Sequence, residues 1–284
     1  MKRTVFFWVC LAMCLPGCSR EKPLPHAPRP RVVSHSPALT HILLQMGLHE
    51  HVVGVTAYCP ELPGEKRPVV GDLTGVNTEA ILAADPDIVL IQQKPEDFTL
   101  LRRVQPGVTV AHFRLDRLED IPEAAFRIAD LLGKPDVGIK AMTAFGMDLV
   151  LVEGLVAHLP KPRMLAVMGT EHPSVHGAGS FMVDLIEKAG GTNAAKAIPG
   201  SKPWRNTTLE QIVNAKPEVL LVQVSDAEAA RKYWMQWEDI PAVRNDRVHI
   251  LTDDAWMRPT LKMPTLAKKL AKMIHPGSWS GETP

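Results

Sequence analysis

The longest uninterrupted hydrophobic pattern lies between residues 136 and 159, where no proline occurs although the chain has 25. Apolar residues recur there three or four positions apart, which predicts a helix with one apolar face. These residues are Ile139, Met142, Phe145, Leu149, Val152 and Val156. Asp136 can cap the start of the helix, and Pro160 and Pro162 end it. Such a helix would span about 36 Å, which suits a strut between two bodies. A long core helix in a single domain is the alternative.

The two sides of this helix carry the same sequence pattern. Residues 77–91 (NTEAILAADPDIVLI) match residues 208–222 (TLEQIVNAKPEVLLV) at a constant offset of 131. Each copy predicts a short helix, a proline break and a buried parallel strand rich in Val, Ile and Leu. Glu79 and Glu210 occupy equivalent positions in the two copies. A repeat at this distance predicts two similar lobes joined by the helix.

Short strands alternate with helices through most of the remaining chain, as in parallel sheets. We therefore expect an α/β fold of two Rossmann-like lobes with parallel central sheets, joined by one long rigid helix. Residues 169–176 and 199–206 are expected to be loops. The expected boundaries are an N-terminal lobe at 31–135, the helix at 136–159, a C-terminal lobe at 160–276 and a tail at 277–284.

The first 18 residues have the features of an export signal. Lys2 and Arg3 precede an apolar core at 4–15, which is too short to span a bilayer comfortably. The core ends in Leu-Pro-Gly-Cys18, which resembles a bacterial lipoprotein signal whose cysteine becomes lipidated. A plain cleaved leader is the alternative, because the proline departs from that pattern. We expect residues 19–30, rich in proline, to tether a body anchored through Cys18 at a periplasmic or cell-surface face of a bacterial membrane.

Charge and cysteine content narrow the function classes. The net charge is +1 and basic runs are absent, so the sequence shows no basic patch that would bind nucleic acid. Of the four cysteines, only Cys59 falls in the expected folded body, which therefore has no internal disulfide. The sequence also lacks a GxSxG motif, a phosphate-binding glycine loop and a cysteine cluster. These absences favour a binding protein over an enzyme.

Ligands of open parallel sheets lie beyond the carboxyl ends of the strands. The loops expected there carry His35, Tyr58, His172, His176, Trp204, Trp256 and Arg258. The two tryptophans and the tyrosine could stack on a flat macrocycle. The three histidines could converge on a metal, but no HxH or HExxH spacing supports an intrinsic metal site. Cys59 is expected to be a buried, inert thiol more than a metal ligand.

Several segments together resemble a known family over residues 31–276. They are Val33-Ser-His-Ser-Pro-Ala38, Gly54-Val-Thr-Ala-Tyr-Cys-Pro60, the unit at 77–91, residues 177–193 and Ala242-Val-Arg-Asn-Asp-Arg-Val248. They are similar to the helical-backbone substrate-binding proteins of ABC importers for vitamin B12, haem and iron–siderophores. The resemblance implies a monomer that partners a permease dimer with its ATPase. It also implies that Glu79 and Glu210 dock on permease arginines.

The resemblance further implies a ligand between the lobes. The candidate ligand-binding residues are His35, Ser36, Tyr58, Cys59, His172, His176, Trp204, Asp254, Trp256 and Arg258. The Tyr-Cys-Pro stretch is closest to cobalamin-binding members, so a corrinoid is the expected ligand. Haem or a ferric siderophore is the alternative, although Arg258-Pro-Thr-Leu lacks the second arginine usual in this family after the last strand. A zinc or manganese receptor of the same plan is the second alternative.

Overall fold

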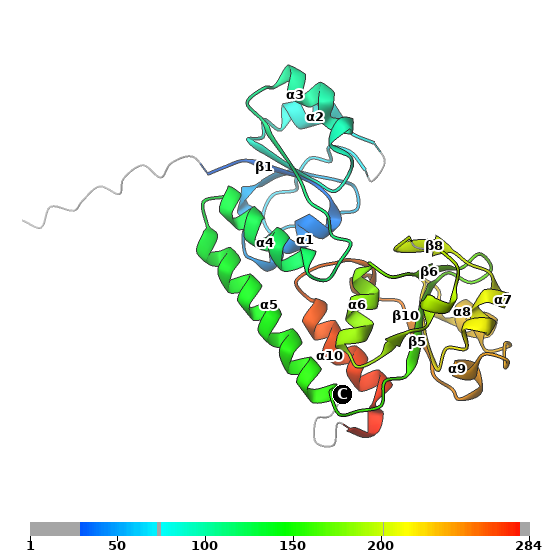
Figure 1. Cartoon of the computed structure of the whole chain (residues 1–284). Coiled ribbons are helices and arrows are strands. Elements are labelled where there is room, and N and C mark those ends of the chain that lie inside the picture. Colours follow the sequence, from blue (N-terminus) through cyan, green and yellow to red (C-terminus); the bar gives the residue numbers. More distant parts are fainter. Residues whose placement is uncertain (1–28, 73–74, 201, 279–284) are drawn as a thin grey trace, which may run out of the picture.

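The computed structural model describes residues 29–72, 75–200 and 202–278. Figure 1 shows two α/β lobes connected along one side by the long helix α5 (Pro135–Val156). The predicted fold class is confirmed: both lobes have sheets with parallel strands at their centre. Cys18, its leader and residues 19–28 of the expected tether lie outside the described residues, as do residues 279–284.

The N-terminal lobe is built on a four-stranded parallel sheet with the strand order β2-β1-β3-β4. The strands are β1 (Val32–His35), β2 (Val52–Val55), β3 (Ile88–Ile91) and β4 (Thr109–His112). The helices are α1 (Pro37–Gln45), α2 (Thr78–Ala83), α3 (Thr99–Val104) and α4 (Asp120–Leu131). The central strands β1 and β3 are buried along their whole length, because helices cover both faces of a parallel sheet.

The C-terminal lobe has a mixed sheet with the order β10-β9-β5-β6-β8, and β7 also pairs with β5. Its strands are β5 (Arg163–Met168), β6 (Ser174–His176), β7 (Thr192–Asn193), β8 (Trp204–Asn206), β9 (Val219–Gln223) and β10 (Val248–Leu251). Its helices are α6 (Phe181–Lys188), α7 (Leu209–Ala215), α8 (Ala227–Trp234), α9 (Pro241–Arg244) and α10 (Met263–Ile274). Strands β5, β9 and β10 are parallel, whereas β6 and β8 are antiparallel additions.

Two segments expected to be loops therefore contain strands. The prediction was wrong for residues 174–176 and 204–206, which form β6 and β8. Strands of three residues are too short to show an alternating pattern in the sequence. The connection from β5 to β6 is also too short for the crossover that a parallel strand would need, so the chain turns back as a hairpin.

The internal repeat reappears in the hydrogen bonds of the two lobes. Arg31 donates through Nη2 to the carbonyl of Ala84 at 2.7 Å, and its backbone N–H donates to Asp87. Arg163 makes the equivalent bonds to Ala215, at 2.5 Å, and to Glu218. The residues before the two repeat prolines are both left-handed, with φ of 45° at Asp85 and 47° at Lys216. The matched sequences thus encode the same helix-to-strand turn twice.

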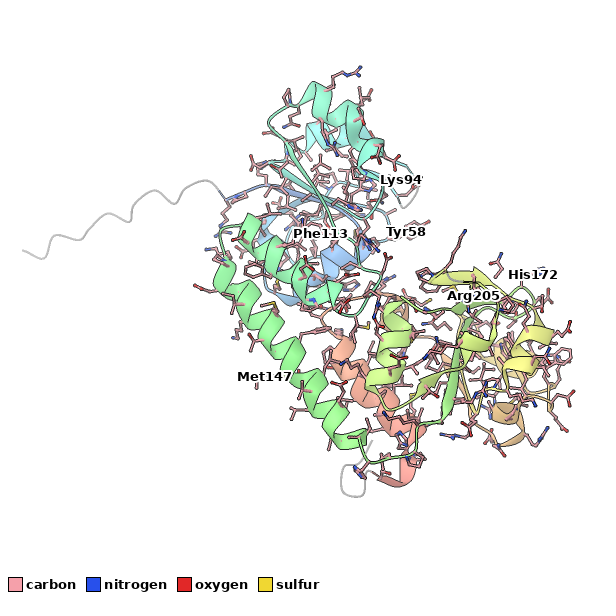
Figure 2. All side chains as sticks on the ribbon, in the orientation of Figure 1. Tyr58, Lys94, Phe113, Met147, His172 and Arg205 are labelled. Carbon is pink, nitrogen blue, oxygen red and sulfur yellow. The ribbon has the colours of Figure 1, made fainter. Side chains whose placement is uncertain are left out.

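Helix α5 is apolar on more than one side. Its buried side includes Phe145, Leu149, Val152 and Val156, and packs against α4 and α10. Its outward side exposes Met147, labelled in Figure 2, with Val150 and Leu151. Within the part of the chain that the structure describes, no helix combines the length and apolar character that a bilayer crossing requires.

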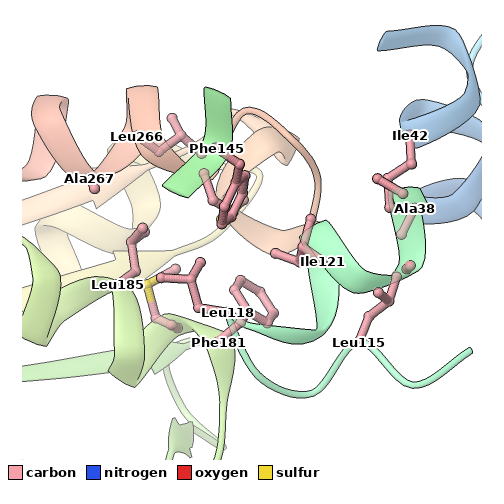
Figure 3. Packing of buried hydrophobic residues seen from close by; sticks show 14 of the residues in the cluster. Ala38, Ile42, Leu115, Leu118, Ile121, Phe145, Phe181, Leu185, Leu266 and Ala267 are labelled. Carbon is pink, nitrogen blue, oxygen red and sulfur yellow. The ribbon is translucent and has the colours of Figure 1, made fainter. Parts of the chain in front are cut away.

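The two lobes share one hydrophobic core beside α5. Leu118 and Ile121 from the N-terminal lobe belong to the same buried cluster as Phe145, Phe181 and Leu185. Figure 3 shows these side chains together, with Leu266 of α10 beside them. An ion pair also links the lobes, because Arg117 Nε donates to Asp184 Oδ2 at 2.7 Å. Both contacts restrain the relative position of the lobes at the base of the molecule.

Candidate ligand-binding site

The carboxyl ends of the parallel strands lead to the sides of the two lobes that face each other. In the N-terminal lobe, Tyr58 follows β2 and Lys94 follows β3. Both lie on the side turned toward the C-terminal lobe, where β8 forms the facing edge (Figures 1 and 2). This arrangement places the polar and aromatic residues of two sheets on opposed surfaces, as expected for a ligand held between lobes.

Each opposed surface exposes one large aromatic side chain. Tyr58 is 60% exposed, and Trp204 on β8 is 38% exposed. Each ring offers an apolar face and carries a polar group at its edge. Of the predicted aromatic contacts, these two are therefore accessible to a ligand.

A cavity of about 460 Å³ opens in the C-terminal lobe, beyond the ends of β5 and β9. Its lining includes Met168, Thr170, Gln223, Asp226 and Met257. The accessible lining combines apolar thioethers with a hydroxyl and a carboxylate, whereas the side chain of Gln223 has no exposed surface. This composition is typical of a site that binds the polar edge of a largely apolar molecule.

Trp256 is buried, although its place after a strand predicted a side chain accessible to a ligand. Its side chain is only 1% exposed and is part of the core shared by the lobes. It follows β10 in a short 3-10 turn, Asp254–Met257. A position after a strand therefore did not give Trp256 access to a ligand, because this turn folds the indole inward.

Asp254 and Arg258 pair with each other. Arg258 Nη2 donates to Asp254 Oδ2 at 2.7 Å, and its Nη1 lies 3.4 Å from His41 Nε2 in the other lobe. Burial and the nearby Arg258 guanidinium lower the pKa of His41. The guanidinium thus bridges to α1 of the N-terminal lobe, and the exposed carboxylate of Asp254 is the more accessible of the pair.

His35 and Ser36 are buried at the end of β1. His35 has no exposed surface and meets the edge of Phe98 at 5.2 Å between ring centroids. Burial lowers its pKa, opposed by Gln93 and the charge of Asp72. Ser36 caps α1 by accepting from the N–H of Leu39 at 3.3 Å. Both side chains are therefore buried inside the N-terminal lobe and do not line the surface that faces the C-terminal lobe.

The three histidines of the metal hypothesis do not come together. His35 and His176 are buried in different lobes, and His172 is exposed in the loop between β5 and β6 (Figure 2). In residues 29–72, 75–200 and 202–278, no group of three or more His, Cys, Asp or Glu side chains is arranged to hold a metal ion. The described residues therefore lack the arrangement that the metal alternative would need.

Cys59 lies among hydroxyl groups instead of in an apolar pocket. Thr40 Oγ1 donates to its Sγ at 3.0 Å, and Thr56 Oγ1 lies 3.1 Å from the same atom. The thiol is partly buried and free. These contacts join β2 to α1 and fix the start of the loop that carries Tyr58.

The polar residues that follow β3 and end β9 were not among the predicted site residues. Gln92, Gln93 and Lys94 come directly after the buried strand β3, and Gln223 is the last residue of β9. Gln92 and Gln223 obey the repeat offset of 131, one residue beyond the matched stretches. The internal repeat therefore extends one position beyond the matched stretches and relates these two glutamines.

The docking candidates Glu79 and Glu210 are both exposed. Each is the second residue of its helix, after the caps Asn77 and Thr208. Figure 1 places α2 and α7 at the outer parts of different lobes. The repeat therefore yields two widely separated carboxylates in the same local setting.

We expect acid to destabilise the protein through His176. Burial lowers the pKa of His176 from 6.5 to about 4, because the charged form loses its hydration. Between these values the unfolded chain binds a proton that the native state does not, so the free energy of unfolding falls as pH falls. The loss from pH 6.5 to 4 should be about 3 kcal/mol. Denaturant titrations of His176→Phe should lack this part of the pH dependence, and equal slopes in both proteins would contradict the assignment.

Comparisons with known proteins agree with this geometry. A family model described as periplasmic binding protein matches residues 32–255. The chain is 26% identical over 255 residues to a vitamin B12-binding protein of Vibrio campbellii, covering 88% of this chain and 91% of the relative. The chain's fold is similar to that of the solved periplasmic vitamin B12-binding protein of Vibrio cholerae, with a TM-score of 0.73, 23% identity and coverage of 87% of this chain and 98% of that one.

A second solved structure shows the same architecture. The fold is similar to that of the periplasmic heme-binding protein of Roseiflexus sp. RS-1, with a TM-score of 0.75, 22% identity and coverage of 88% and 99%. The family match spans most of the chain, from β1 to the turn after β10. The chain therefore belongs to the periplasmic binding protein family.

Proposed function

We propose that this protein is the extracytoplasmic substrate-binding component of an ABC importer and that it captures a corrinoid, such as vitamin B12, between its two lobes. The observation that carries this proposal is the pair of exposed aromatic rings, Tyr58 and Trp204, on facing surfaces of two similar lobes. A flat, largely apolar macrocycle with a polar rim matches two such surfaces. The relative from Vibrio campbellii, which is described as binding vitamin B12, supports the same ligand class.

Haem or a ferric siderophore is the alternative ligand, and the structural similarity to the heme-binding protein of Roseiflexus supports it. Haem carries two carboxylates, which are best recognised by free arginine side chains. Arg258 is engaged by Asp254, and Arg205 donates to the carbonyls of Ala195 and Ile198. These contacts favour a corrinoid, whose amide side chains suit glutamines and a lysine, over a dicarboxylate.

In the proposed binding step, the ligand replaces water on the two aromatic faces. Polar side chains would contact the rim of the ligand from both lobes. On the N-terminal lobe these are Gln92, Gln93 and Lys94, and on the C-terminal lobe Asp226. The shared core and the Arg117–Asp184 pair hold the bases of the lobes together. Preformed surfaces of this kind lower the ordering cost of binding.

In the proposed delivery step, Glu79 and Glu210 dock the loaded protein on arginines of a two-fold permease. Charge complementarity would fix the register of the complex.

The proposal includes a lipid anchor at Cys18, which lies outside the described residues and stays a prediction from the sequence. A zinc or manganese receptor remains the second alternative and would require a cluster of metal ligands.

The two exposed rings provide the test of capture. Trp204→Ala and Tyr58→Ala should each weaken binding of cyanocobalamin by about 1–3 kcal/mol, because truncated aromatic anchors lose buried contact area. Isothermal titration measures this loss. Trp237→Ala is the control, since Trp237 packs with the core of the C-terminal lobe and should leave affinity unchanged in the folded fraction. If neither ring matters within ~0.5 kcal/mol, the stacking model is wrong.

A further inference from the structure

A series of buried contacts connects the turn after β10 to the ring of Trp204. Gln223 Nε2 donates to the carbonyl of Trp256 at 2.9 Å, and Gln223 Oε1 lies 2.8 Å from His176 Nε2. Gln223 and His176 have no exposed surface. The imidazole of His176 then meets Trp204, with 3.8 Å between ring centroids. Three strands, β9, β6 and β8, are joined by these contacts.

These hydrogen bonds fix the orientation of the Gln223 amide and the tautomer of His176. A backbone carbonyl can only accept, so the amide NH₂ of Gln223 must face Trp256 and its oxygen must face His176. That oxygen can only accept, so Nε2 of His176 carries the proton. Nδ1 is left as an acceptor without a hydrogen-bond partner. The low pKa of His176 agrees with a neutral ring.

Trp204 depends on this support because of its place in the sheet. Strand β8 is the last strand in the sheet order and has only three residues. Among the strands of the described residues it pairs with β6 alone, and in that register Trp204 lies directly opposite His176. Directly opposite side chains are the pairs that stabilise neighbouring strands. Phe181 touches the same cluster, with centroids 6.1 Å from His176 and 6.5 Å from Trp204.

We propose that Gln223 is a positioning residue of the ligand site, which fixes the ring of His176 so that His176 holds Trp204 in its ligand-facing orientation. This inference rests on the proposed function in treating Trp204 as a ligand contact. The repeat gives independent support. At the equivalent position of the other lobe, Gln92 Oε1 accepts from the hydroxyl of Ser36, which caps α1. A glutamine at the same strand end thus fixes a neighbouring element in each lobe.

The test uses Gln223→Met, which keeps the length of the side chain and removes both hydrogen bonds. Protein labelled with 5-fluorotryptophan gives one ¹⁹F signal per tryptophan, and Trp204→Phe identifies the signal of Trp204. In the ligand-free protein, Gln223→Met should shift or broaden that signal. The ¹⁵N spectrum should show that His176 has lost its preference for the Nε2–H tautomer. Gln236→Met is the matched control, because that exposed glutamine bonds only locally to the carbonyl of Tyr233 and should leave Trp204 unchanged.

A double-mutant cycle of Gln223 and His176, measured as affinity for cyanocobalamin, is the second part of the test. Gln223→Met should weaken binding about five- to tenfold, part of the effect of removing an aromatic anchor. In a His176→Phe background, where a ring still supports Trp204 without the hydrogen bond, Gln223→Met should add nothing further. Independent effects would instead add. Additive losses would show that Gln223, which lines the cavity, touches the ligand itself, and would overturn the positioning role.

The ¹⁹F and ¹⁵N signals separate this inference from the proposed function. An unchanged Trp204 signal and an unchanged His176 tautomer in Gln223→Met would overturn the positioning role, whatever the ligand. If the wild-type protein does not bind cyanocobalamin, the proposed corrinoid function fails, while the ligand-free spectra still decide whether Gln223 positions Trp204.

Discussion

Replacing both Glu79 and Glu210 by lysine is expected to abolish uptake while leaving ligand affinity intact. The two carboxylates are exposed, lie on different lobes and occupy the same helix position. Charge reversal would oppose two arginine pockets at once, and like charges across an interface cost several kcal/mol. We expect transport into vesicles carrying the partner importer to fall on the order of a hundredfold or more.

A matched pair of lysine substitutions controls for the change in net charge. Glu123 and Glu228 are exposed on α4 and α8, and Glu228 is also the second residue of its helix. Glu123→Lys with Glu228→Lys should leave uptake near the wild-type rate. Normal transport by the Glu79 and Glu210 double variant, or a parallel loss of ligand affinity, would contradict the docking role.

Phe145→Ala should destabilise the whole protein, because Phe145 lies where both lobes meet α5. The side chain is 4% exposed and packs in the cluster that contains Leu118 of one lobe and Leu185 of the other (Figure 3). Truncating a buried phenylalanine costs about 3–5 kcal/mol through lost burial and the remaining cavity. Denaturant unfolding monitored by circular dichroism measures the change.

Met147→Ala is the matched control on the same helix. Met147 is 63% exposed on the outward side of α5, so its truncation should change the free energy of unfolding by no more than about 0.5 kcal/mol. If Phe145→Ala were equally mild, the two lobes would not share a core at this position. An unfolding curve that separates into two transitions only in Phe145→Ala would show that this side chain couples the lobes.

The architecture could be predicted from the sequence because its main features, the long helix and the repeated lobe, are each encoded in a continuous stretch of residues. The proline-free stretch predicted α5 to within a few residues, from Pro135 to Val156 instead of 136 to 159. The repeat predicted two equivalent helix-to-strand turns, and the matching bonds of Arg31 and Arg163 show them in both lobes. Such features depend on neighbours in sequence, so a pattern can report them.

The ligand site was harder to predict because burial depends on packing across distant segments. Trp256 and His176 both follow or end strands, as predicted site residues should, yet each is covered by other elements. The hairpin of β6 and β8 brought His176 beneath Trp204, and three-residue strands leave no periodic signal. Gln223 stood one residue beyond the repeat, where its hydrogen bonds to His176 and Trp256 could not be foreseen from spacing.

The central claim is that a corrinoid binds between the two lobes, and separate titrations of the purified protein with three ligands test it most directly. Cyanocobalamin, haemin and a ferric hydroxamate siderophore are each added while ligand absorbance and tryptophan emission are recorded. The account predicts saturable binding of one cyanocobalamin per chain, with quenched emission that Trp204→Ala reduces, and weaker binding of the other two ligands. Tighter binding of haemin or the siderophore, with no saturable cyanocobalamin signal, would contradict it.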